Sequence, residues 1–121
     1  MANPNIVNVT SILGKSLQAA LTTSLTTEIL ANAGSSGEVY KINSILIANV
    51  DGTSAADASV FITKSGGSPI AIASTISVPA DSTLTVIDKN TSFYLEEGDN
   101  IEAGASADSD LVITISYEII S

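Results

Sequence analysis

The chain has 121 residues, contains no cysteine or histidine, and carries a formal net charge of −9 at neutral pH. Its length predicts a single domain whose core needs no metal or disulfide, and the missing imidazole and thiol groups remove the usual general bases, zinc ligands and nucleophiles of enzymes. The negative charge repels nucleic-acid phosphates and anionic lipid head groups, so we expect neither nucleic acid nor a membrane as a partner.

Residues 1 to about 15 are predicted to be an extended N-terminal arm, separate from the domain over residues 16–121. Pro4 and three asparagines are unusual at the start of a folded domain, and both a frayed tail and a docking arm or swapped edge strand fit this stretch. Because it has neither a basic leader nor a continuous apolar core, we expect no signal peptide and assembly in the host cytoplasm. The arm contributes five candidate partner-binding residues: Ile6, Val7, Val9, Ile12 and Leu13.

The first half of the domain is predicted to be strands. Leu21–Leu30 alternates leucine with threonine, which favours a strand, while a short helical turn at Ser16–Ala20 also fits. Lys41–Val50 is apolar on both faces, as is typical of a strand in the centre of a sheet. Shorter strands are expected at Ala58–Lys64, Thr83–Asp88, Ser92–Leu95 and Ile101–Ala105.

Two longer runs show the alternation of a strand with one core face. In Pro69–Val78 the predicted core residues are Ile70, Ile72, Ile76 and Val78. In Leu111–Ile120 they are Leu111, Ile113, Ile115, Tyr117 and Ile119. Dense turn signals separate these runs, and the whole pattern predicts an all-β fold: a single antiparallel β-sandwich, jelly-roll-like, with an N-terminal arm.

Three further apolar residues are predicted to lie on the outside of the sandwich. Alternation places Phe61, Ile87 and Tyr94 opposite the core residues of their own strands. Scattered apolar surface is common, and a contact surface on one face of the sandwich is the alternative interpretation. The second interpretation predicts self-association, most plausibly as a trimer.

The acidic residues Glu96, Glu97, Asp99 and Glu102 gather near the turn at Gly98. Paired carboxylates serve glycoside cleavage in other proteins, and carboxylate loops hold calcium. The chain has few aromatic residues to form a sugar platform, and no segment matches a twelve-residue calcium loop. We therefore expect solvated structural turns, with no catalytic residue, cofactor or metal.

Taken together, four segments resemble a family of small structural proteins of tailed bacteriophages, notably those of marine cyanobacteria and similar hosts. The resemblance covers nearly the full length and is carried by MANPNIVNVTSILGKS, KINSILIANVDGTSAADASVFI, ISVPADSTLTVIDKNTSFYLEEGDNIEA and SDLVITISYEIIS. It implies a virion component without enzymatic activity.

Within a virion, the resemblance favours a capsid decoration (cement) protein, often a homotrimer, that bridges coat-protein subunits and stabilises the head. The arm would then contact the shell by adding a strand to a coat-protein edge. A tail, neck or fibre/baseplate protein is the alternative. A host-glycan-binding module is a further one, and it predicts a pocket lined by aromatic rings.

Overall fold

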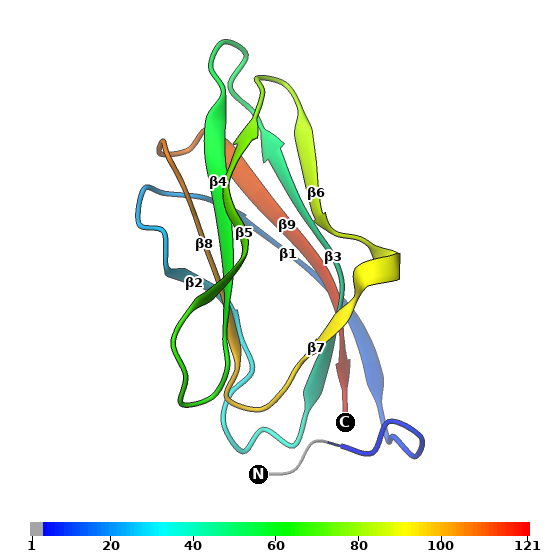
Figure 1. Cartoon of the computed structure of the whole chain (residues 1–121). Helices are drawn as coiled ribbons and strands as arrows, with labels where there is room; N and C mark the ends of the chain where they lie inside the picture. The colour runs from blue at the N-terminus through cyan, green and yellow to red at the C-terminus, as the bar shows by residue number, and fades with distance from the viewer. Residues whose placement is uncertain (1–3) are drawn as a thin grey trace.

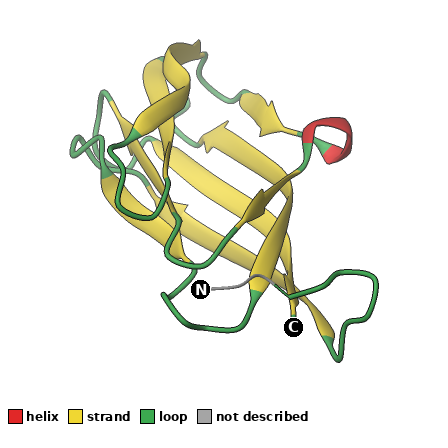
Figure 2. Cartoon of the chain, turned by 60° about the horizontal axis from the view of Figure 1, so that its bottom comes forward, coloured by secondary structure: helices red, strands yellow, loops and turns green. Residues whose placement is uncertain are grey.

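The computed structural model describes residues 4–121, which fold into two β-sheets packed face to face (Figures 1 and 2). A short 3-10 helix, η1 (Lys89–Thr91), follows the sixth strand. The strands are β1 (Ile12–Ala20), β2 (Thr27–Ala31), β3 (Val39–Asn49), β4 (Ala56–Thr63), β5 (Ile70–Val78), β6 (Thr83–Ile87), β7 (Phe93–Leu95), β8 (Asn100–Ala105) and β9 (Leu111–Ile120).

The two sheets have the topology of a jelly roll. The five-stranded sheet has the order β1-β9-β3-β6, with β7 also paired to β3, and the four-stranded sheet has the order β2-β8-β4-β5. The antiparallel pairs β1·β9, β2·β8, β3·β6 and β4·β5 are nested, as in one long hairpin that has been rolled into two layers. This arrangement confirms the all-β sandwich expected from the sequence.

The core lies between the sheets and is made of branched aliphatic side chains. From the five-stranded sheet, Ile45 and Ile115 are fully buried, and Val60 and Ile101 meet them from the four-stranded sheet. The predicted strand Leu111–Ile120 has the same bounds as β9, and its alternate residues Leu111 to Tyr117 are buried. β3 lies between β9 on one side and β6 and β7 on the other, which confirms the central position expected for Lys41–Val50.

The start of the domain differs from the prediction. Residues 12–20 form β1, which is paired with β9 along its whole length, so no helical turn forms at Ser16–Ala20. Residues 12–15 of the expected arm therefore belong to this strand. The predicted strand Leu21–Leu30 is wrong over residues 21–26, because the chain there crosses from one sheet to the other before β2 begins.

β5 is a strand as predicted, but most of its isoleucines do not reach the core. Val78 is buried, whereas Ile70 is 69% exposed and Ile72 and Ile76 are each 40% exposed. β5 is the edge strand of its sheet, and its register with β4 shifts twice. Because each shift breaks the alternation, and because the sandwich is open along this edge, the periodicity of the sequence overstated the burial.

Candidate functional site

Asp99 is the centre of the acidic turn that the sequence marked out. Its side chain is only 2% exposed and accepts three hydrogen bonds, from the backbone N–H groups of Ser65 and Glu96 and from the Nζ of Lys64. Lys64 also forms an ion pair with Glu96. Asp99 thereby ties the turn between β7 and β8 to the end of β4.

Glu97 and Asn32 extend this network to the connection between β2 and β3. Glu97 accepts a hydrogen bond from the backbone N–H of Gly37, and the Asn32 amide donates to the backbone carbonyls of Glu38 and Leu95. Both side chains are buried. We call Asn32, Lys64, Glu96, Glu97 and Asp99 the Asp99 corner.

Two further features show that the Asp99 corner is closely built. Gly98 has φ +85°, and a Cβ there would lie 2.6 Å from the Oγ of Ser65, so only glycine fits without strain. The hydrogen bonds to Asp99 and then Glu96 raise the pKa of Lys64 above its ordinary value. The two carboxylates therefore stabilise the protonated, positively charged form of Lys64.

The Asp99 corner has the contacts of a structural turn. The carboxylate oxygens of Asp99 and Glu97 accept hydrogen bonds from backbone N–H groups and, in the case of Asp99, also from Lys64. Such contacts hold loops in place. The fourth acid, Glu102, lies on β8 and accepts from the hydroxyl of Thr63. Among residues 4–121, no group of three or more acidic side chains is arranged to hold a metal ion.

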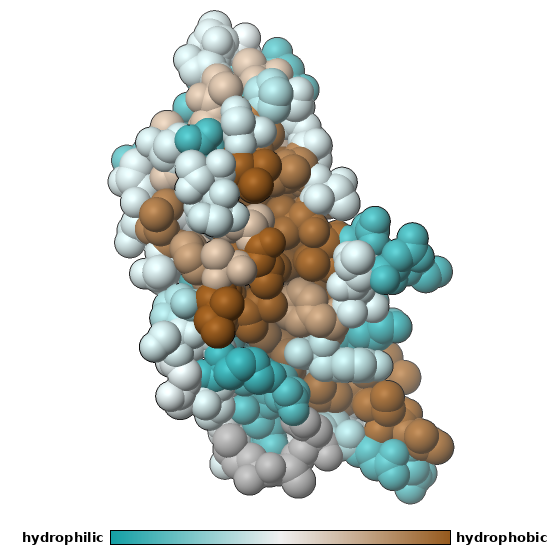
Figure 3. All heavy atoms as spheres, in the orientation of Figure 1, coloured by the Kyte–Doolittle hydropathy of each residue, from teal (hydrophilic) through white to brown (hydrophobic). Residues whose placement is uncertain are grey.

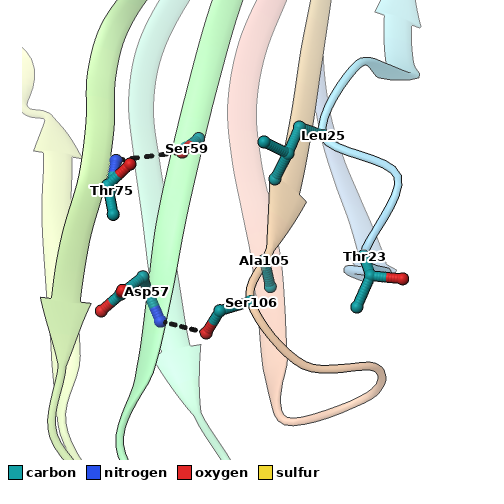
Figure 4. Close-up of a pocket in the computed structure, with 7 residues that line it drawn as sticks. All are labelled: Thr23, Leu25, Asp57, Ser59, Thr75, Ala105 and Ser106. Carbon is teal, nitrogen blue, oxygen red and sulfur yellow. Dashed lines mark hydrogen bonds between the residues drawn. The ribbon is translucent and has the colours of Figure 1, made fainter.

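A shallow depression of about 270 Å3 lies on the outer face of the four-stranded sheet (Figure 4). The hydroxyl of Ser59 accepts a hydrogen bond from the backbone N–H of Thr75, and that of Ser106 accepts one from Asp57. The seven lining residues offer hydroxyl, carboxylate and aliphatic groups: Thr23, Leu25, Asp57, Ser59, Thr75, Ala105 and Ser106. This lining differs from the aromatic platform that a glycan-binding module predicts.

The loop over residues 22–26 forms one wall of this depression. Gly104 of β8 lies directly beneath it, and a Cβ at Gly104 would come within 2.3 Å of the Leu25 Cα. The backbone N–H of Ala105 donates to the carbonyl of Thr22. The loop therefore rests on the sheet because glycine permits a close approach of the two backbones.

The N-terminal segment, residues 4–11, folds back toward the C-terminus. Thr10 and Ser11 are hydrogen-bonded through their backbones to Ser121, and both described ends lie at the same end of the sandwich (Figure 1). Val7 is 91% exposed and Ile6 is half exposed, whereas Val9 is half-buried. The predicted contact residues of this segment thus include two that remain open to a partner.

Ile6 also lines an apolar groove with Tyr94. The groove has a volume of about 320 Å3, and its other lining residues include Pro4 and Val39. Val39 is buried although it lies outside the main core cluster. Two of the sequence-predicted contact residues, Ile6 and Tyr94, are therefore brought together at this end of the molecule.

The structure does not place Phe61, Ile87 and Tyr94 on one face, and the predicted common surface is wrong. Phe61 lies on the four-stranded sheet opposite Glu102, whereas Tyr94 lies on the five-stranded sheet opposite Lys41. Ile87 pairs with the buried Ile45 and packs against the core. A register shift in the β3·β6 ladder turns Ile87 inward, and simple alternation cannot foresee such a bulge.

The predicted contact residues of β1 are more exposed. Ile12 and Leu13 are each more than half exposed, and they lie on opposite faces of this edge strand. Ile12 shares a row with Ile120 and, through β9, with Val39 on the outer face. The free edge of β1 therefore carries apolar side chains on both sides.

A further apolar surface contains Ile70, Ile72 and Ile76, which were predicted to lie in the core. Figure 3 shows apolar atoms gathered along the opening between β5 and β6. These two strands are neighbours in space although they belong to different sheets. We call this surface the β5–β6 seam; it consists of the exposed Ile70, Ile72 and Ile76 and the half-buried Leu84, Val86 and Ile87.

Comparison with models of known protein families gives no match for this chain, and comparison with curated proteins gives no significant match. In residues 4–121, no helix has the length and apolar character required to cross a membrane. The residues of the chain itself are therefore the basis for proposing a function.

Proposed function

We propose that this chain is a non-enzymatic structural protein of a tailed-bacteriophage virion. In this proposal it is a capsid decoration protein that binds at junctions between coat-protein subunits as a homotrimer. The observation that carries the proposal is the set of large apolar side chains that the folded sandwich leaves open. Ile70, Ile72 and Ile76 of β5 are 69%, 40% and 40% exposed, and several large apolar side chains left open along one strand usually have a partner.

The polar groups support the same proposal. Asp99 and Glu97 belong to the acidic group that was considered for glycoside cleavage or calcium binding. Both are buried and accept hydrogen bonds from backbone N–H groups of their own chain. A protein of this kind works through contact area. Each copy would add a modest area at a coat junction, and many copies together would stabilise the shell against the pressure of packaged DNA.

The resemblance of four segments to phage structural proteins is the second support. It favours a virion over other assemblies, and the compact sandwich suits a part that sits on a surface. In this mechanism the N-terminal segment and β1 contact the shell. β1 pairs with β9 on one side and forms the end of its sheet, so a coat-protein strand can add to its other edge.

A tail, neck or fibre protein is the second candidate. The exposed side chains of the N-terminal segment suit a contact with a tail protein as well as one with a coat protein. Copy number separates the two. We expect purified particles of the encoding phage to contain hundreds of copies, measured by quantitative mass spectrometry against the coat protein. A handful of copies would assign the chain to the tail, and its absence from particles would overturn both proposals.

A binding assay with purified shells tests the shell-contacting element. Deletion of residues 1–9 leaves β1 and the Ser11–Ser121 backbone bonds in place. We expect this deletion to weaken binding about tenfold or more, because it removes the exposed Ile6 and Val7. Val50→Ser, at an exposed apolar site in a loop, is the control and should bind normally. Unchanged binding of the deletion would exclude residues 4–9 as the contact.

A further inference from the structure

The edge strands of the two sheets differ in the charge that they carry. β1 has Lys15 and β2 has Glu28. β5 has nine residues and no charged one. The stretch Ser65–Ala80 contains no ionisable side chain at all, and neither does β6.

An uncharged edge with three exposed isoleucines is a liability unless something covers it. Ile70, Ile72 and Ile76 of β5 are exposed, whereas the apolar side chains of β6 pack against the core. Figure 3 shows apolar atoms gathered between these two strands. The β5–β6 seam is thus continuous with the core itself. Water at this surface faces residues of the kind that the rest of the fold buries.

We propose that the β5–β6 seam is covered by a second copy of this chain, and that it is the surface through which copies self-associate. This inference rests on the proposed function, since it names the contact that would build the proposed trimer. Its test below is separate from the test of virion location.

The charge distribution indicates that the molecule covering the seam is a second copy of this chain. Two copies with a net charge of −9 repel each other over most of their surfaces. The seam is the exception, because residues 65–80 and β6 bring no charge into the contact. A basic partner would find no opposite charge here to recognise, whereas a copy of the same chain offers an equally apolar, uncharged surface.

The backbone of β5 favours contact through side chains over extension of the sheet. Thr75 has φ +53°, and the ladder between β4 and β5 shifts register twice. The N–H of Thr75 is bonded to the Ser59 hydroxyl instead of continuing the ladder. A bulged edge presents an irregular row of donors and acceptors, so the isoleucines are the part that a second copy can use.

Sedimentation velocity of the full chain over a concentration series tests the proposal. We expect a concentration-dependent oligomer, of two or three copies, that becomes tighter when salt is added, because salt screens the repulsion between the acidic surfaces. Association driven by opposite charges would weaken with salt. A chain that stays monomeric at all concentrations and salt levels would overturn the proposal.

The variant Ile70→Lys/Ile72→Lys places two charges in the seam. It should raise the dissociation constant on the order of 100-fold or more, because like charges would meet in an apolar contact. The control Val50→Lys changes an exposed apolar side chain in a loop outside the seam and should shift the constant less than about threefold. Equal effects of the two variants would contradict the assignment.

Circular dichroism checks that the double variant is folded. If it is not, Ile70→Lys alone carries the test, since this side chain has the greater exposure of the two. The copy number in particles remains an independent result. A particle-bound monomer would remove the seam proposal and leave the virion function, whereas an oligomer that is absent from particles would do the reverse.

Discussion

The Asp99 corner and the β5–β6 seam belong to the same sandwich and illustrate opposite uses of side chains. In the corner, Asp99 is buried with three donors on its carboxylate, and Glu97 is buried against a backbone N–H. In the seam, Ile70, Ile72 and Ile76 are strand residues that the fold leaves in water. The polar side chains of the corner hold loops together, while the apolar side chains of the seam remain exposed to solvent.

This difference separates side chains that stabilise the fold from side chains that are proposed to bind another copy. Removing a group from the corner should lower the free energy of unfolding and leave association unaffected. Changing the seam should weaken association and leave the free energy of unfolding of the monomer nearly unchanged. The following predictions test that separation, starting with the change expected to lower the free energy of unfolding the most.

Asp99→Ala is expected to have the largest effect on stability. It removes a buried carboxylate, leaves the N–H groups of Ser65 and Glu96 without their acceptor, and breaks the ion pair with Lys64. The cost should be about 3–5 kcal/mol of unfolding free energy, as for other broken buried pairs. Urea denaturation measures it. Glu28→Ala, at an exposed carboxylate in β2, should change the value by less than about 0.5 kcal/mol.

Gly98→Ala should cost about 2 kcal/mol or more in the same corner. The cost has two causes: the left-handed backbone at φ +85° and the contact of the new methyl group with Ser65. Gly14→Ala in β1 is the matched control, because a Cβ there meets no atom within 4 Å. Thermal unfolding of the pair should separate them clearly, and equal melting temperatures would mean that the corner tolerates a different turn.

The sequence predicted the strands in the middle of the sheets better than those at the edges. β9 was predicted with its bounds and its buried face, because both of its neighbours are strands and alternation controls its burial. β3 was recognised as central from its two apolar faces. Where a strand has partners on both sides, local periodicity and tertiary environment agree.

At the edges, that agreement fails for identifiable reasons. β5 alternates as a core strand would, yet two register shifts and an open sandwich expose its isoleucines. Ile87 was expected outside and faces inward because of a bulge. The acidic residues of the Asp99 corner were found from sequence. Asn32, whose backbone N–H donates to the carbonyl of Asp99, lies far away in the chain, and only the folded structure brings the two together.

A smaller effect is expected from alkaline pH. Burial, followed by the charge of Glu38, raises the pKa of Tyr40, and hydrogen bonds to Asp99 and Glu96 raise that of Lys64. A group whose pKa is higher in the folded state adds stability below its unfolded pKa and loses it as pH rises through the folded one. Both groups therefore predict a loss of stability above about pH 10.

The sum should be about 1 kcal/mol or less, since solvent screens the half-exposed Lys64. Urea midpoints at about pH 9 and about pH 11 measure it. Tyr40→Phe and Lys64→Met should each flatten the decline, while Lys89→Met, at an exposed lysine, should not. A decline that persists in both variants would assign the alkaline loss to the general repulsion of the acidic surface.

The smallest change in stability is expected in the seam. Ile70→Ser alters the free energy of unfolding of the monomer by less than about 0.5 kcal/mol, because most of this side chain is already in water. The measurement belongs at high dilution, where association no longer adds to apparent stability. Ile45→Ala in the core should cost about 3 kcal/mol by the same method. If Ile70→Ser lowered the free energy of unfolding as much as Ile45→Ala, the seam would be a part of the core that needs no partner. Its exposed isoleucines would then no longer support a binding surface.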